Sequence, residues 1–182
     1  MIIAYHAIFT TYGSWLPNDP RGSYSKDVYV REIALLGKGH YGLVAPQPPP
    51  EMVSRFLFVA AGQLKHPPYV LGAECRELVA AGFGNVVDRL QIPVIECAIM
   101  SNHVHVLVWR TKYRIEYIVN QLKGAATVQL GAPYPPWTRK AWKIFLDKED
   151  AVEACAAYVR ENPMAAGLTA QHWDFVKRYG RP

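Results

Sequence analysis

The strongest constraint on the fold is a pair of apolar segments in the middle of the chain, IPVIECAIM (92–100) and HVHVLVW (103–109). Only Ser101 and Asn102 separate them, so they predict two antiparallel strands joined by a tight turn. Side chains two residues apart in a strand share a face. His103 and His105 should therefore lie side by side, while the valines that alternate with them face the core.

The remaining pattern predicts four further elements at apolar spacings typical of strands or helices. These are a strand at 2–11, helices at 74–90 and 114–130, and a strand at 142–146. A last helix at 148–162 should stop at Asn162, because a proline disfavours the helical conformation in the residue before it. This order predicts an α+β fold: a ferredoxin-like or RRM-like antiparallel sheet with helices on one face and an added C-terminal helix. We expect one domain over residues 1–182.

The first third of the chain is less regular. YGSWLPNDPRGS (12–23) is rich in turn residues, and 24–50 ends in the proline-rich APQPPP. Residues 51–64 are compatible with either a helix or a strand. Connections this long are uncommon in compact domains and are more often functional than idle.

Composition excludes some classes of protein. The longest apolar runs of this 182-residue chain are shorter than a membrane span, and its three cysteines are scattered. The net charge of +5 permits a nucleic-acid partner without requiring one. WTRKAWK (137–143) and FVKRYGRP (175–182) combine basic and aromatic residues, which suits either phosphates with stacked bases or an ordinary solvated face.

The paired histidines and the last helix contain the candidate chemistry. Two neutral imidazoles on one strand can bind a single divalent ion, although they can equally form a hydrogen-bonded pair. Tyr158 and Asn162 are four residues apart, so they share one stripe of the last helix. The phenol could be a nucleophile and the amide oxygen a third metal ligand, whereas the structural alternative is a surface tyrosine.

These motifs resemble a known family. MSNHVHVLV (100–108) resembles the HUH signature (histidine, hydrophobic residue, histidine) of single-tyrosine DNA transposases. YVRENPMAAGL (158–168) resembles the tyrosine motif of REP-associated tyrosine transposases, a branch of the IS200/IS605-like superfamily, and LKG (122–124) lies between the two motifs. The resemblance covers both ends and the middle of the chain and misses mainly residues 24–70.

The resemblance implies metal-dependent cleavage and strand transfer of single-stranded DNA at hairpin-forming palindromic repeats, through a 5′-phosphotyrosine intermediate. It makes Tyr158 the nucleophile, His103 and His105 ligands of Mg²⁺ or Mn²⁺, and Asn162 the third ligand. Many relatives have glutamine at the position of Asn162. It also implies a bacterial, cytoplasmic, nucleoid-associated protein with no membrane partner, acting as a monomer or a homodimer.

Five residues are candidates for DNA contact through charge or stacking: Lys123, Arg139, Lys140, Trp15 and Arg21. Core packing is the alternative for the tryptophan, and an ordinary helix surface is the alternative for Lys123.

Three other functions fit parts of the sequence. An HUH replication initiator or relaxase would share the histidine pair, but such chains are usually longer and often have a second tyrosine near the first. An RRM-like, non-catalytic single-strand binder would need aromatic residues where His103 and His105 stand. A domesticated, inactive transposase would bind DNA without cleaving it.

Overall fold

A computed structural model describes residues 1–23 and 42–177. The chain divides into two compact units, Met1–Thr10 with Val70–Pro182 and Thr11–Tyr69. The single domain expected over 1–182 stays a prediction. Part of the segment expected to be irregular (24–41) and the end of the basic tail (178–182) lie outside the described residues. Among the helices that are described, none combines the length and apolar character needed to span a bilayer.

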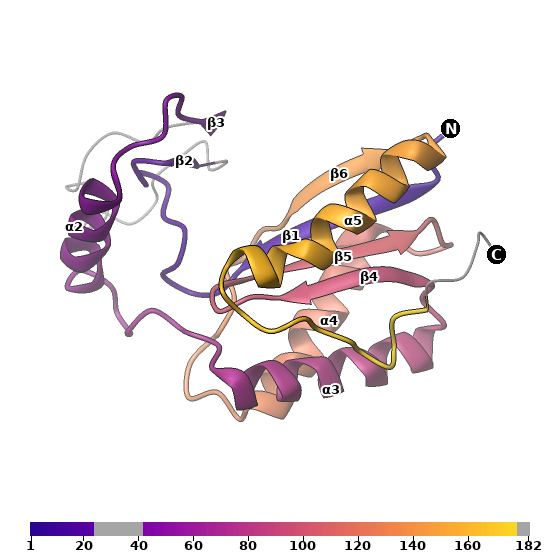
Figure 1. The fold of residues 1–182 in the computed structure, drawn as a ribbon. Coiled ribbons are helices and arrows are strands. Elements are labelled where there is room, and N and C mark those ends of the chain that lie inside the picture. Colours follow the sequence, from indigo (N-terminus) through magenta and orange to yellow (C-terminus); the bar gives the residue numbers. More distant parts are fainter. Residues whose placement is uncertain (24–41, 178–182) are drawn as a thin grey trace. The chain divides into compact units, whose positions relative to one another are not determined.

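The first unit is built on a four-stranded antiparallel sheet (Figure 1). Its strands are β1 (Ala4–Thr10), β4 (Val94–Ile99), β5 (His103–Trp109) and β6 (Trp142–Leu146). They lie in the order β4-β5-β1-β6, and each neighbouring pair is antiparallel. This is the strand order of a ferredoxin-like fold, so the predicted α+β class is confirmed.

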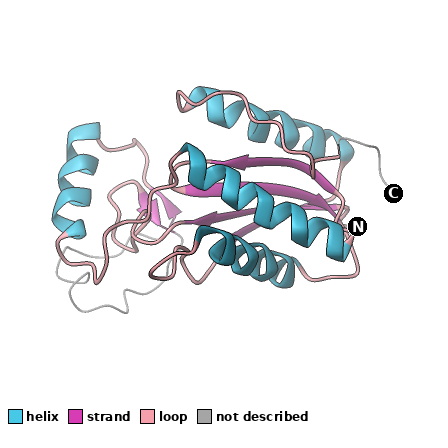
Figure 2. Cartoon of the chain, turned by 90° about the horizontal axis from the view of Figure 1, so that it is seen from below, coloured by secondary structure: helices cyan, strands magenta, loops and turns pink. Residues whose placement is uncertain are grey.

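Helices cover both faces of this sheet (Figures 1 and 2). They are α3 (Ala73–Leu90), α4 (Ile115–Leu130) and α5 (Glu149–Ala165). Phe9 of β1 faces α3, and its ring centroid lies 6.2 Å from that of Phe83. Side chains alternate along a strand, so His6 and Ile8 face the opposite side, where α5 packs.

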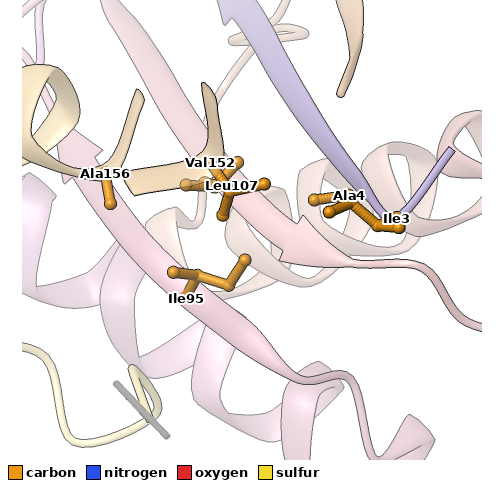
Figure 3. Close-up of a cluster of buried hydrophobic side chains, with 6 residues drawn as sticks. All are labelled: Ile3, Ala4, Ile95, Leu107, Val152 and Ala156. Carbon is orange, nitrogen blue, oxygen red and sulfur yellow. The ribbon is translucent and has the colours of Figure 1, made fainter. Parts of the chain in front are cut away.

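A small apolar cluster fixes α5 on the sheet (Figure 3). Val152 and Ala156, one helical turn apart, pack with Leu107 of β5 and with Ile95 of β4. All four side chains are buried. The other sides of α5 therefore face the edge of the sheet and the solvent.

The predicted end of α5 at Asn162 is wrong, because the helix continues through Pro163 to Ala165. Proline lacks an N–H, but in the last turn this removes only one helical hydrogen bond. The helix ends in a Schellman motif instead. Leu168 N donates to Pro163 O at 2.8 Å, and Gly167, with φ +74°, supplies the left-handed residue.

Gly82 of α3 is required by the close approach of α4. A Cβ atom at this position would lie 2.9 Å from the backbone nitrogen of Ala126, and a backbone cannot yield as a flexible side chain can. We expect Gly82→Ala to lower the free energy of unfolding by about 1–3 kcal/mol, because overpacking outweighs the better helix propensity of alanine. Urea denaturation measures the change.

Gly84 is the matched control, since a Cβ there would meet only Phe175, at 3.8 Å. Gly84→Ala should raise the free energy of unfolding by about 0.5–1 kcal/mol. Equal effects of the two substitutions would contradict this account of the helix crossing.

The second unit contains α2 (Pro50–Ala61) and a two-stranded sheet of β2 (Gly22–Ser23) and β3 (Gly42–Leu43). Its apolar centre is formed by Leu16 and Ala60. Pro50 occupies the first turn of α2, where the missing N–H costs nothing. The segment whose type the sequence left undecided is therefore mainly helical.

Candidate active site

The two histidines of β5 lie side by side on the face covered by α5, as their spacing predicts. Their Nε2 atoms are 2.9 Å apart. His105 is only 3% exposed, whereas His103, at the start of the strand, is half-buried. Val104 and Val106 are buried on the other face.

A third histidine, His6 of β1, extends this pair into a chain of three imidazoles. Its Nε2 lies 3.0 Å from Nδ1 of His105, and the two rings are stacked with centroids 5.2 Å apart. The sheet register explains the contact: Ile8 is paired with His105, and His6 shares its face. The sequence analysis missed His6, because only the register brings it to the pair. The one indication in the sequence was that His6 lies in a segment that alternates like a strand.

His103 is oriented by the turn that precedes it. Its Nδ1 lies 2.7 Å from Oδ1 of Asn102. An amide oxygen can only accept a hydrogen bond, so Nδ1 of His103 donates and its Nε2 retains a lone pair.

Burial keeps the inner two imidazoles neutral. Burial, with a smaller contribution from the charges of His103 and His6, lowers the pKa of His105 to about 3. Burial likewise lowers the pKa of His6 to about 4. Neutral imidazole is the form that binds metal ions, so these side chains are in the ligand state near pH 7.

The histidine pair fits one divalent ion. Two ligands about 2.1 Å from an octahedral ion, at right angles to each other, lie about 3.0 Å apart. The observed Nε2–Nε2 distance is 2.9 Å. No group of three or more His, Cys, Asp or Glu side chains suited to a metal occurs within the described ranges.

Tyr158 of α5 lies next to these imidazoles. Its ring centroid is 5.6 Å from that of His105 and 6.5 Å from that of His6, and both contacts are edge-to-face. The side chain is 55% exposed. A phenol that is held beside neutral histidines and open to solvent can reach a phosphate bound at the same place.

Polar contacts hold the tyrosine helix in register with the sheet. Arg160 donates to the buried carboxylate of Glu96 on β4 at 2.9 Å. Beyond the helix, the Gln171 amide donates to Ile99 O and accepts from Ile99 N, both at 2.8 Å. Both contacts lie at or beyond the C-terminal part of α5, and they fix the rotation of the helix and with it the side on which Tyr158 lies.

Asn162 lies one helical turn beyond Tyr158, on the same stripe of α5, and is half-buried. Its backbone carbonyl accepts a hydrogen bond from Ala166 N at 3.1 Å. Helix α5 thus places the amide on the side that carries the phenol, and its role as a third ligand stays a prediction.

Comparison with known proteins finds a family that resembles the middle of the chain. Residues 64–149 match the model of the family described as IS200-like transposases. This region contains both histidines of β5 and ends before Tyr158. The matched stretch is slightly less than half of the chain, and over it the chain is similar to the IS200-like transposases.

A solved structure has a similar fold. It is a REP-associated tyrosine transposase bound to a REP hairpin, with a TM-score of 0.52 and 7% identity over 91% of this chain and 69% of that chain. A second structure, a candidate transposase from Deinococcus radiodurans R1, has a TM-score of 0.44 and 14% identity over 89% of this chain and 91% of that chain. No curated protein matches the sequence.

Within the IS200-like region, Lys123 is on the face of the sheet opposite the histidines. Its ammonium is 5.1 Å from the ring centroid of Phe9 and donates to the carbonyls of Thr138 and Lys140, at 2.8 and 3.1 Å. Burial lowers its pKa to about 8. Lys123 is thus not brought together with the histidines, and it holds the loop that carries the basic pair.

Arg139 and Lys140 are exposed on that loop. The loop is tied to the end of β1, because Thr138 N donates to Thr10 O at 3.0 Å. Thr10 is in turn paired with His103. The predicted basic pair therefore lies close to the strand end where the histidine pair begins.

The other two candidates belong to the second unit and contact each other. Arg21 lies 4.4 Å from the ring centroid of Trp15 and pairs with both carboxylate oxygens of Asp19, at 2.8 and 2.6 Å. Trp15 donates to Gly22 O at 2.7 Å. These contacts stabilise the loop itself, and DNA binding by either side chain stays a prediction.

Proposed function

We propose that this protein is a transposase that cleaves and rejoins single-stranded DNA by metal-dependent transesterification, with Tyr158 as the nucleophile. The observation that carries the proposal is the position of the exposed phenol of Tyr158. Its ring centroid lies 5.6 Å from that of His105, and Nε2 of His105 lies 2.9 Å from Nε2 of His103. A nucleophile and a pair of metal ligands on facing elements are the parts that such a reaction needs.

In the proposed step, the phenol oxygen of Tyr158 forms a bond to phosphorus as the bond from phosphorus to the 3′ oxygen breaks. The phenol loses its proton to solvent, and the departing 3′ oxygen takes one up. The products are a 5′-phosphotyrosyl link and a free 3′-hydroxyl. Attack by the 3′-hydroxyl of another strand reverses the step and joins the two strands. One phosphoester replaces another, so the reaction needs no nucleotide triphosphate.

His103 and His105, with Asn162 as the third ligand, would hold Mg²⁺ or Mn²⁺. When bound, the ion supplies a Lewis acid that polarises a phosphate oxygen. The protein contributes rigidity. Both imidazoles come from one buried strand, β5, and the tyrosine comes from a helix that an ion pair and an amide hold against the neighbouring strand, β4.

The nucleophile and the metal ligands of the proposed site come from one chain. The ring of Tyr158 contacts histidines of its own sheet. This contact supports a site formed within one protomer, and the formation of a homodimer stays a prediction.

The proposed substrate is single-stranded DNA that contains hairpin-forming palindromic repeats. One protein of similar fold was solved bound to a REP hairpin. Arg139 and Lys140, exposed beside the end of β1, are placed to contact phosphates that flank the scissile bond.

Replacing both basic residues tests this contact. We expect Arg139→Ala/Lys140→Ala to weaken single-strand binding, and to reduce the slope of log affinity against log salt by about 0.7 for each phosphate that is no longer neutralised. Fluorescence anisotropy at several salt concentrations measures both quantities. Arg89→Ala is the control, because Arg89 is also exposed but lies on α3 and donates to Gln121. An unchanged slope in the double variant would remove these residues from the interface.

A covalent-complex assay tests the proposed reaction. The full chain is incubated with 3′-labelled oligonucleotides from palindromic repeats near its own gene, with Mn²⁺, with Mg²⁺, or with EDTA. We expect a labelled protein band on a denaturing gel in the presence of metal and none with EDTA. Tight binding without any covalent band would favour the non-catalytic alternative.

A further inference from the structure

We infer that His6 is a positioning residue: it accepts a hydrogen bond from Nδ1 of His105 and thereby directs the Nε2 lone pair of His105 toward the metal. This inference rests on the proposed function, since it concerns the same metal site. The register between β1 and β5 connects His6 with the histidine pair.

The argument starts from the chemistry of a neutral imidazole, which has one N–H and one lone pair. If Nε2 of His105 binds an ion, Nδ1 must carry the hydrogen and needs an acceptor. Nε2 of His6 lies 3.0 Å from that atom, within hydrogen-bond distance. The other ring nitrogen of His105, Nε2, lies 2.9 Å from Nε2 of His103. The two nitrogens of His105 therefore point at different neighbours.

His6 is held in place more firmly than a surface partner would be. It lies in the central strand β1, where it is paired with Leu107 on one side and with Ile144 on the other. Its side chain is 2% exposed, so solvent water has little access to replace it. Its ring is stacked on His105 with an interplanar angle of 21°.

His6 also contacts the proposed nucleophile, with ring centroids 6.5 Å apart. The same imidazole therefore touches both the inner metal ligand and the phenol. Removing an outer partner that orients a metal ligand typically weakens metal binding by about 10–100-fold.

Metal titration of variants of the full chain tests the inference. Mn²⁺ is titrated into metal-free protein by calorimetry for wild type, His6→Leu and His6→Gln. We expect His6→Leu to weaken Mn²⁺ binding by about 10–100-fold. The glutamine oxygen can reach the position of the imidazole Nε2, so His6→Gln should restore most of the affinity.

Leu107→Val is the packing control, because Leu107 is paired with His6 and buried on the same face. It should lower Tm without changing the affinity for Mn²⁺. A purely structural role of His6 would instead make affinity fall with Tm in all variants, and this would overturn the inference.

The imidazole tautomer gives an independent readout. In ¹⁵N NMR spectra recorded at a Mg²⁺ concentration that saturates wild type, His105 should carry its hydrogen on Nδ1 in wild type and in His6→Gln. His6→Leu, which is only partly loaded at that concentration, should show a mixture of the two tautomers. If wild type binds Mn²⁺ and His6→Leu binds it equally well with the same tautomer, the inference alone fails. If wild type binds no metal, the metal site of the proposed function fails together with it.

Discussion

Tyr158→Phe will abolish the covalent protein–DNA complex and lower cleavage of single-stranded DNA by a factor of about 10³ or more. The substitution removes only the attacking oxygen. The ring that packs edge-to-face against His105 and His6 remains, so neither the fold nor metal binding should change. Denaturing gels measure the covalent product, and anisotropy shows that the variant still binds DNA.

Tyr117→Phe is the matched control for this experiment. Tyr117 is also an exposed helical tyrosine, 42% exposed, but it lies on α4 and stacks on Tyr113. It should retain full activity. A covalent band that persists in Tyr158→Phe would place the nucleophile elsewhere in the chain.

Replacing the β5 histidines by alanine will remove metal-dependent cleavage, with a loss of about 10²-fold or more for each single variant. His103 and His105 act as one ligand pair, so the double variant should be scarcely worse than either single variant. Single-turnover cleavage over a range of Mn²⁺ concentrations measures the loss.

Because His105 is buried, a loss of activity in His105→Ala could come from a damaged fold as well as from a lost metal ligand, and the two causes must be separated. His103 is half-buried and lies at the start of its strand, so His103→Ala should keep the wild-type Tm while losing activity. His172→Ala, which changes an exposed histidine after α5, should keep both. Full cleavage by His103→Ala would exclude the histidine pair as the metal site.

Local periodicity was sufficient to predict much of this molecule. The alternation in HVHVLVW placed His103 and His105 on one face, and the helical spacing in ECRELVAAGFGNVVDRL predicted α3 although Gly82 weakens its propensity. The strand at 142–146 was predicted with its observed bounds. These features depend on residues a few positions apart, and a sequence displays such relations directly.

Features that depend on distant residues could not be predicted. His6 joins the histidine pair only through the register between β1 and β5. Lys123 was expected near phosphate, yet α4 directs its ammonium to the carbonyls of the basic loop on the other face. The end of α5 was missed for a different reason: the rule for residues before proline is a preference, and the Schellman motif at Gly167 outweighs it.

Peptide mapping of the covalent complex tests the central claim most directly. Wild-type protein is reacted with a single-stranded oligonucleotide and Mn²⁺, digested with nuclease and protease, and analysed by tandem mass spectrometry. We predict one modified peptide, with a 5′-linked deoxynucleotide phosphate on Tyr158. An adduct on any other residue, such as Tyr113 or Tyr134, would contradict the assignment of the nucleophile.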